Sequence, residues 1–205
     1  MPAQPMDTGE PDGGQRLTDL TNAVHDLAGH SAIADALGRF AAEDLVYLSL
    51  PLLAWLYFRQ PSLRPFLAAA LAAVLAIGIA ATIGVVDYVP RPFVAENFTP
   101  LIAHAPDASF PSDHLAALGA LFGVSWFTTR RFSIAIALLA VAVAFARVYA
   151  GVHWITDVVG GFGIGAASGT VTWYASGLTR RSIDSVDQRL RRWHLRPEWL
   201  ITGPS

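Results

Sequence analysis

Long uncharged segments constrain this chain more than any other feature of its sequence. The 205 residues are 53% apolar, and residues 65–86 contain no charged side chain. A helix of about 20 apolar residues crosses a bilayer about 30 Å thick. The runs 65–89, 132–150 and 158–178 are each near that length. We therefore predict an integral membrane protein rather than a soluble all-helical one.

Two shorter apolar segments complete the predicted bundle. Residues 45–58 reach spanning length when the preceding 40–42 are included, and residues 114–127 reach it only with their flanks, 112–129. The expected fold class is therefore all-α, a helical bundle with five transmembrane helices. The third of these helices, over 112–129, is the shortest.

Glycine spacing in the last apolar run predicts how its helix packs. Gly161, Gly165 and Gly169 recur every four residues, so they share one face of a helix. A face of small residues lets a neighbouring helix approach closely. We expect this face to lie against another helix of the bundle.

The N-terminal part has a different pattern. Residues 1–16 are rich in proline, glycine and acidic side chains, which predicts disorder and not a signal peptide. Between Thr18 and Phe40 the apolar residues are spaced as in amphipathic helices, with a break at Gly29-His30-Ser31. We predict two short helices on the membrane surface; a sixth, half-inserted helix is the alternative.

The placement of arginine predicts the orientation in the membrane. All fourteen basic residues are arginine, and most of them lie in the segments 59–64, 130–131 and 180–196. Cytoplasmic loops carry an excess of positive charge, so these segments are expected to be cytoplasmic. The loops 89–111 and 147–156 then face the outer side.

The chain divides accordingly into a membrane-embedded domain over residues 17–180 and a cytoplasmic tail over 181–205. In the tail, apolar residues share one face and arginines lie elsewhere, which predicts contact with anionic lipid. The net charge of −2 indicates no nucleic-acid partner. The absence of cysteine excludes disulfides and thiolate metal sites.

His153 is the first candidate for chemistry, as a nucleophile. Asp157 follows four residues later, on the same face of a helix. A carboxylate on one ring nitrogen fixes the tautomer, leaves the other nitrogen free to attack phosphorus and stabilises the resulting cation. The alternative is a histidine–aspartate pair that only packs a loop against a helix.

The segment Phe110-Pro111-Ser112-Asp113-His114 supplies further candidates. His114 fits a general acid, because a histidine with an ordinary pKa of about 6.5 can protonate a leaving group near neutral pH. Ser112 is a natural N-cap, and the free N–H groups of a helix start attract an anion. Asp113 has two interpretations, contact with the substrate or simple stabilisation of the helix start. An ordinary capped helix is the alternative for the whole segment.

Arg91 and Arg147 are candidate phosphate clamps. Guanidinium groups give permanently charged, forked donation to phosphate oxygens. Arginines at a membrane edge are often anchors, but these two lie on the side where positive charge is scarce. Glu43 and Asp44 either face the same cavity or lie in solvent. This set of residues requires no cofactor and no metal ion.

Together these segments resemble the three signature motifs of the type 2 phosphatidic acid phosphatase superfamily, which includes the vanadium haloperoxidases. The resemblance spans roughly 85–161, with the matching residues Arg91 in the first motif, Ser112 and His114 in the second, and Arg147, His153 and Asp157 in the third. The sequence departs from the pattern twice. A lysine usually lies seven residues before the first arginine, where this chain has Gly84, and Asp113 replaces a glycine.

The flanking residues resemble one branch of the superfamily, the bacitracin-resistance type undecaprenyl-diphosphatases. The resemblance extends over roughly 17–178 and includes Pro90-Arg91-Pro92-Phe93 and the N-terminal residues Asn22, Gly29-His30-Ser31, Asp35 and Phe40-Ala41. It implies hydrolysis of undecaprenyl diphosphate through a phosphohistidine at His153, on the outer face of the bacterial plasma membrane. Such a reaction recycles the lipid carrier for wall synthesis.

The same sequence is compatible with other functions. The same site could act on phosphatidylglycerophosphate or phosphatidate, or could pass the phosphoryl group to a lipid acceptor instead of water. A haloperoxidase is disfavoured because those enzymes are soluble. A non-catalytic lipid-binding or transport protein is the alternative of another class, and Gly84 is the residue that favours it.

Overall fold

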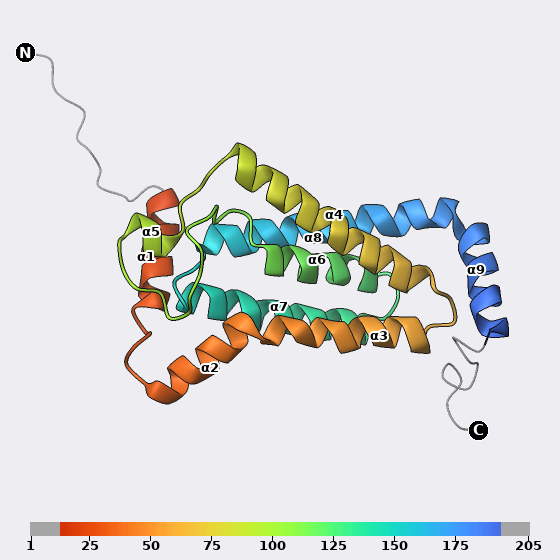
Figure 1. The fold of residues 1–205 in the computed structure, drawn as a ribbon, viewed down its shortest axis with the longest axis horizontal. Helices are drawn as coiled ribbons and strands as arrows, with labels where there is room; N and C mark the ends of the chain where they lie inside the picture. The colour runs from red at the N-terminus through yellow and green to blue at the C-terminus, as the bar shows by residue number, and fades with distance from the viewer. Residues whose placement is uncertain (1–12, 194–205) are drawn as a thin grey trace, which may run out of the picture.

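The computed structural model describes residues 13–193, and these contain helices but no strand. Along the chain the helices are α1 (Gly13–His25), α2 (Ala32–Glu43), the 3-10 helix η1 (Leu45–Leu48), α3 (Ser49–Arg59), α4 (Arg64–Val86), α5 (Pro92–Ala95), α6 (Asp113–Ser125), α7 (Arg130–Tyr149), α8 (Ile155–Leu178) and α9 (Arg180–Arg192). Helices α3, α4, α6, α7 and α8 run along the molecule, while α1 and α9 lie across its two ends (Figure 1). The predicted all-α bundle is confirmed.

The number of membrane spans is supported more loosely than the fold class. Helices α4 and α7 are long and apolar enough to cross a membrane, and α2 with η1 and α3 forms a third candidate bent by 53°. Helix α6 has only 13 residues, and α8 has 24 residues that include many glycines, serines and threonines. Length and composition therefore support two or three spans, while the five predicted positions are all occupied by helices of the bundle.

Apolar side chains on the outer faces of the bundle agree with a membrane setting. Helices α4 and α7 expose large apolar residues along their length, among them Leu71, Val74, Ile79, Leu138 and Val141. An aqueous surface rarely exposes apolar patches of this extent. The described residues thus form a membrane protein whose outer surface suits contact with lipid.

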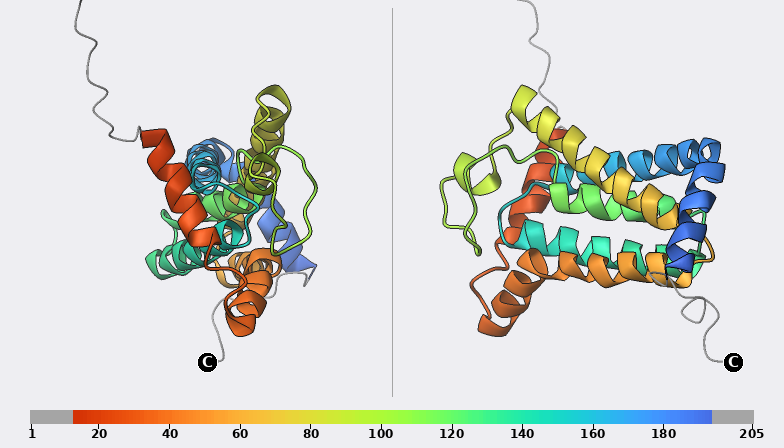
Figure 2. Two further views of the ribbon diagram at one scale, coloured as in Figure 1. Left: turned by 90° about the vertical axis from the view of Figure 1, so that its left-hand side faces the viewer. Right: turned by 45° about the vertical axis from the view of Figure 1, so that its right-hand side comes forward.

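Helix α6 is the central element of the bundle. In the right-hand view of Figure 2 it lies between α4 and α7, and almost every residue of its last three turns is buried. On the α4 side it meets a stripe of alanines, Ala69, Ala72, Ala76 and Ala80, each at most 2% exposed. Small side chains at these positions let the two helices pack closely.

Helices α6 and α8 approach each other through glycines on both sides. A Cβ atom added at Gly161, Gly165 or Gly169 would overlap the backbone of α6 or of the residue that precedes it. Gly119 and Gly123 face α8 in the same way. The glycine face predicted for the last apolar run is therefore confirmed on α8, and the helix that packs against it is α6.

The N-terminal helices pack against the end of α7 that leads into the third motif. Gly29, with φ of +83°, makes the break between α1 and α2, and Ser31 is the N-cap of α2. Asp35 accepts a hydrogen bond from the hydroxyl of Tyr149 at 2.6 Å. In α1, His25 contacts the Tyr149 carbonyl oxygen at 3.1 Å. These contacts tie the N-terminal pattern to the residues just before His153.

Two predictions on the ends of the chain fall largely outside the described residues. Of the segment 1–16, expected to be disordered, residues 13–16 form the first turn of α1 and the rest is not described. Helix α9 accounts for the first part of the basic tail, and residues 194–205 lie outside the described range. Contact of this tail with lipid stays a prediction.

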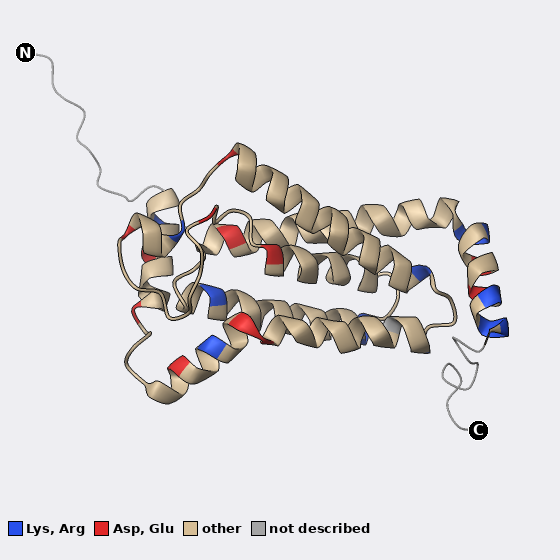
Figure 3. Cartoon of the chain, in the orientation of Figure 1, with Lys and Arg blue, Asp and Glu red and all other residues tan. Residues whose placement is uncertain are grey.

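Charged residues separate along the bundle. The basic helix α9 lies at one end, and the three motif segments lie at the opposite end (Figure 3). Arg64 fixes its end by stacking 3.9 Å from the Trp173 ring and by donating to Ser176 at 2.9 Å. The separation agrees with the predicted arrangement of arginine relative to the motifs.

The glycine contact between α6 and α8 predicts a stability difference within one helix. Gly165→Ala places a methyl group against the α6 backbone and should lower the free energy of unfolding by about 1–3 kcal/mol. Gly163→Ala is the matched control, because its Cβ would meet nothing within 4 Å. Thermal unfolding in detergent measures both variants, and equal midpoints would contradict the close contact.

Candidate active site

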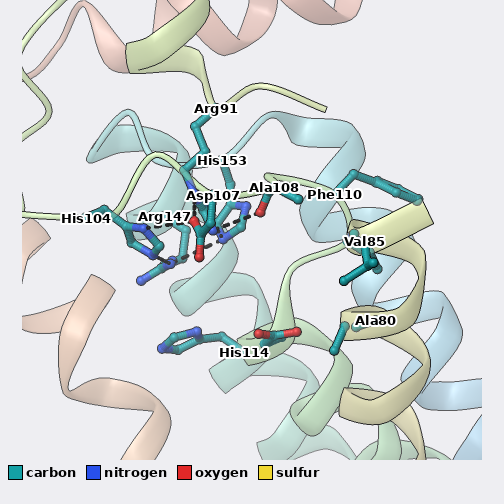
Figure 4. Close-up of a pocket in the computed structure, with 14 residues that line it drawn as sticks. Ala80, Val85, Arg91, His104, Asp107, Ala108, Phe110, His114, Arg147 and His153 are labelled. Carbon is teal, nitrogen blue, oxygen red and sulfur yellow. Dashed lines mark hydrogen bonds and ion pairs between the residues drawn. The ribbon is translucent and has the colours of Figure 1, made fainter. Parts of the chain in front are cut away.

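The three motif segments meet around a cavity of about 330 Å³ at one end of the bundle (Figure 4). One wall comes from the last turns of α4 and is apolar, with Ala80, Ala81, Gly84 and Val85. The other walls are polar and carry the charged and titratable side chains Arg91, His104, Asp107, Asp113, His114, Arg147 and His153. The cavity therefore joins a site for an anion to a surface that suits a hydrocarbon chain.

His153 lies at the centre of the polar side and is 2% exposed. Its Nδ1 is 3.3 Å from Asp157 Oδ2, and its Nε2 is 3.3 Å from Arg91 Nη1 and 3.2 Å from Arg147 Nη2. Guanidinium groups only donate, so Nε2 accepts and Nδ1 carries the proton. This is the tautomer expected for a nucleophilic Nε2.

The His153–Asp157 pair forms in a way that differs from the sequence prediction. His153 precedes α8 instead of lying on it, and Trp154 is the N-cap of that helix. Asp157 Oδ2 accepts the Trp154 N–H at 2.8 Å and the hydroxyl hydrogen bond of Ser109. Asp157 is fully buried, so these donors hold its carboxylate in one orientation toward the imidazole.

Burial keeps the His153 ring neutral. Desolvation lowers the pKa of His153 to about 4, and the positive charges of Arg147 and Arg91 act in the same direction. The hydrogen bond to Asp157 opposes this effect but does not overcome it. A pKa well below neutral leaves the lone pair of Nε2 available at physiological pH.

Arg91 is held by three acceptors from two separate segments. Its Nε donates to Asp107 at 2.8 Å, its Nη1 to the Val152 carbonyl at 2.8 Å and its Nη2 to the Ala108 carbonyl at 3.1 Å. It is 5% exposed and stands at the N-cap position of α5, where Pro92 follows it. The guanidinium group is thus fixed before any ligand binds.

Arg147 reaches the cavity from the last turn of α7 and is 4% exposed. Its Nη1 donates to the Ala42 carbonyl at 3.2 Å, and its Nη2 is 3.1 Å from His104 Nε2. The Nε atom is buried and has no hydrogen-bond partner among the described residues. A donor left in this state beside a cavity suits an anionic ligand.

The second motif is placed by the start of α6. Ser112 occupies the N-cap position, but its hydroxyl makes no cap hydrogen bond, contrary to our expectation for this side chain. The hydroxyl is buried and lacks a partner within the described range, while the Ser112 N–H donates to the Asp157 carbonyl at 3.1 Å. His114 lies across the cavity from His153 in Figure 4, and Asp113 lines the cavity with an exposed side chain.

Of three further positions, Gly84 lines the cavity and Glu43 and Asp44 do not. Glu43 and Asp44 are exposed and are not among the residues that line the cavity, which agrees with the solvent alternative. Gly84 does line the cavity, and its Cβ would lie 3.1 Å from the Ala108 Cβ. The position where the first motif usually has a lysine is therefore part of the apolar wall.

Sequence reasoning missed three residues of the loop between the first two motifs. His104 contacts Arg147, Asp107 pairs with Arg91, and Ser109 donates to Asp157. The available signal was the close spacing of polar residues just before Phe110. Nothing in that spacing alone predicts which residue each of them contacts.

The two titratable groups of this loop are affected by the arginines. Desolvation lowers the pKa of His104, and the charges of Arg91 and Arg147 lower it further. Desolvation raises the pKa of Asp107, but the hydrogen bond and charge of Arg91 outweigh it and bring that pKa below its ordinary value. In the ligand-free site His104 is therefore neutral and Asp107 ionised at neutral pH.

The fold and the site together define a helical membrane protein with two buried arginines beside a buried histidine at one end of its bundle. The chain belongs to the PAP2 superfamily, whose family model matches residues 62–181. The resemblance seen in the three motifs is thereby confirmed. Membership identifies the chain as a phosphatase, which sets aside the non-catalytic alternative.

The chain is similar to several known proteins, over most of its length or over a part of it. It is 32% identical over 170 residues to the undecaprenyl-diphosphatase BcrC of Bacillus subtilis. This match covers 82% of the chain and 88% of the relative. It is 33% identical over 186 residues to the putative undecaprenyl-diphosphatase YbjG of Escherichia coli, covering 87% and 88%. Phosphatidylglycerophosphatase B of Bacillus subtilis is 35% identical over a shorter match of 83 residues, 35% of this chain and 40% of the relative.

Solved structures support the fold. The crystal structure of LpxE from Aquifex aeolicus superposes with a TM-score of 0.61 at 24% identity, covering 76% of this chain and 93% of the other. A transmembrane PAP2-type phosphatidylglycerolphosphate phosphatase from Bacillus subtilis superposes with a TM-score of 0.50 at 20% identity, covering 82% and 96%. Both superpositions show the same helical fold.

The lowered pKa of His153 predicts how stability depends on pH. Between about pH 4 and the ordinary histidine pKa of 6.5, the unfolded chain binds a proton at this residue and the folded chain does not. Stability should therefore fall as the pH drops through this window. His153→Gln should make the fall less steep, because glutamine does not titrate.

Thermal unfolding midpoints in detergent, taken from about pH 8 to about pH 4, measure this difference. His30→Gln is the matched control, since His30 is exposed. The same slope for wild type and His153→Gln would show that His153 is not held neutral by the fold.

Proposed function

We propose that this chain hydrolyses the terminal phosphate from a polyprenyl diphosphate, with undecaprenyl diphosphate as the first candidate. The observation that carries the proposal is the Nε2 atom of His153, neutral and placed between the guanidinium groups of Arg91 and Arg147. The two relatives that match over most of the chain, both named for this activity, support the choice of substrate.

In the first half of the proposed reaction, His153 Nε2 attacks the terminal phosphorus. The bond from that phosphorus to the bridging oxygen breaks, and the oxygen leaves with the lipid monophosphate after taking a proton from His114. Arg91 and Arg147 bind the non-bridging oxygens and stabilise their charge in the transition state. Asp157 stabilises the imidazolium that forms when Nε2 bonds to phosphorus.

In the second half, water attacks the phosphohistidine. His114, now neutral, accepts a proton from that water, the bond between nitrogen and phosphorus breaks, and inorganic phosphate leaves. His153 returns to its neutral tautomer. The unpartnered Ser112 hydroxyl and the free N–H groups at the start of α6 are suited to contact the phosphoryl oxygens through both steps.

The composition of the cavity supports a lipid diphosphate. Ala80, Ala81 and Val85 offer an apolar wall on α4, a helix whose outer face suits lipid. Gly84 in place of a lysine removes one cation from the clamp. A diphosphate has a better leaving group than a monoester, so it needs less charge stabilisation and tolerates that loss better.

The proposed place of action is the outer face of the bacterial plasma membrane. The arginine-rich end of the bundle lies opposite the site, and positive charge marks the cytoplasmic side. Product formed on the outer face would be a lipid monophosphate ready for another round of carrier use in wall synthesis. The basic helix α9 would then face anionic lipid on the inner side.

Competition between substrates tests the proposed activity. Purified protein in mixed micelles should prefer a long prenyl diphosphate over phosphatidate by at least about tenfold in kcat/KM, because a site lacking one cation needs the better leaving group. Release of inorganic phosphate is the measurement, and His153→Gln, which removes the nucleophile, provides the blank. Equal or greater kcat/KM for phosphatidate or phosphatidylglycerophosphate would instead favour a general lipid phosphatase.

Cysteine labelling tests the proposed orientation. The chain has no cysteine, so single cysteines can be introduced at the exposed positions Ala103, beside the site, and Gln188, on α9. We expect an impermeant maleimide to label Ala103→Cys in intact cells stripped of outer barriers. Gln188→Cys should react only after permeabilisation, and the reverse pattern would place the site on the cytoplasmic side.

A further inference from the structure

The proposed substrate brings more negative charge than the known motif residues neutralise. A lipid diphosphate carries about three negative charges near neutral pH. The motif arginines, Arg91 and Arg147, supply two positive charges, and Gly84 stands where a lysine supplies another elsewhere in the superfamily. A third cationic group in the same cavity would complete the clamp.

His104 is placed where such a group is needed. Its Nε2 is 3.1 Å from Arg147 Nη2, and the same guanidinium nitrogen is 3.2 Å from His153 Nε2. The two imidazole centroids are 6.4 Å apart, and Figure 4 shows both rings beside Arg147. The attacking nitrogen of His153 and the Nε2 of His104 therefore converge on one point of the phosphate clamp.

His104 is also part of a second histidine–aspartate pair. Its Nδ1 is 3.7 Å from Asp107 Oδ1, and the same carboxylate oxygen accepts from Arg91 Nε at 2.8 Å. The first pair, His153 and Asp157, has a separation of 3.3 Å. Asp107 can therefore support a positive charge on His104, as Asp157 is proposed to do on His153.

We propose that His104 is a third phosphate-binding residue of this site. In its protonated form it donates a hydrogen bond from Nε2 to the phosphoryl group clamped by Arg91 and Arg147. His104 supplies from a loop the positive charge that a lysine at position 84 would supply from α4. This inference rests on the proposed function only to the extent that a phosphoryl group binds in the cavity.

The charge state of His104 should change when the phosphoryl group binds. In the empty site, burial and the positive charges of Arg91 before α5 and Arg147 on α7 disfavour protonation of His104. The rings of His153 before α8 and His114 of α6 face the same cavity. The contact of the His104 Nδ1 with the Ala105 carbonyl at 3.1 Å and the carboxylate of Asp107 favour protonation, and Asp113 faces the same cavity. A bound dianion would reverse this balance, so binding is expected to take up a proton and to strengthen as the pH falls.

Orthovanadate tests the inference without any lipid. Its dissociation constant for the full-length protein in detergent is to be measured at about pH 6 and at about pH 8, for wild type, His104→Gln and His104→Lys. Loss of one charge-assisted hydrogen bond should weaken vanadate binding to His104→Gln by about tenfold or more at the lower pH, and by less at the higher pH. His104→Lys, which stays charged, should retain affinity at both.

The control is His30→Gln, the same substitution at an exposed histidine of the turn between α1 and α2, which should leave vanadate affinity unchanged. Equal affinities of wild type and His104→Gln at both pH values would overturn the inference. Equal losses in the Gln and Lys variants at both pH values would also overturn it, because they would show a structural role.

The result separates this inference from the proposed substrate. Vanadate reports on the phosphoryl site alone, whereas preference for a prenyl diphosphate is measured by competition between lipids. A pH-dependent loss in His104→Gln together with a preference for phosphatidate would support the role of His104 and overturn only the diphosphatase proposal.

Discussion

The distance between α6 and α8 determines the geometry of the whole reaction centre. Gly161 has no side chain where the backbone of Ser112 passes, so the start of α6 reaches α8 and the Ser112 N–H donates to the Asp157 carbonyl at 3.1 Å. This hydrogen bond joins the second motif to the third. Glycines further along both helices keep them equally close along the bundle. A packing interaction in the core therefore sets where His114 stands relative to the nucleophile.

Electrostatics of the site follow from this packing. Two guanidinium groups, each no more than 5% exposed, lie beside a histidine that burial keeps neutral. In bulk water such groups would be hydrated and mobile, but here backbone carbonyls and Asp107 hold them at fixed positions. Preorganised charge of this kind stabilises a transition state without reorganisation at the moment of reaction. On the proposed mechanism, the site thus combines a rigid anion clamp with a nucleophile that does not need deprotonation.

The sequence predicted the bundle and the motif residues better than the loop that joins them. Apolar runs of 20 or so residues and glycines every four residues have direct physical meanings. The predicted glycine contact agrees with the structure, and the apolar runs form helices of the bundle, of which α4 and α7 are each long and apolar enough to span a membrane. The cap hydrogen bond expected of Ser112 does not form, and its hydroxyl is buried without a partner among the described residues. His104, Asp107 and Ser109 were missed because an irregular loop has no periodicity from which contacts can be inferred.

The anchoring of Arg91 has a consequence for turnover. Many anion sites leave a buried cation without partners once the anion departs, and that cost slows release of product. Here the Nε and both Nη atoms of Arg91 already have protein acceptors in the empty site. Departure of phosphate therefore leaves the Arg91 guanidinium group hydrogen-bonded to the protein, whereas the buried Nε of Arg147 has no partner among the described residues. Of the two proposed clamps, Arg91 is the one that needs no anion to hold its position between turnovers.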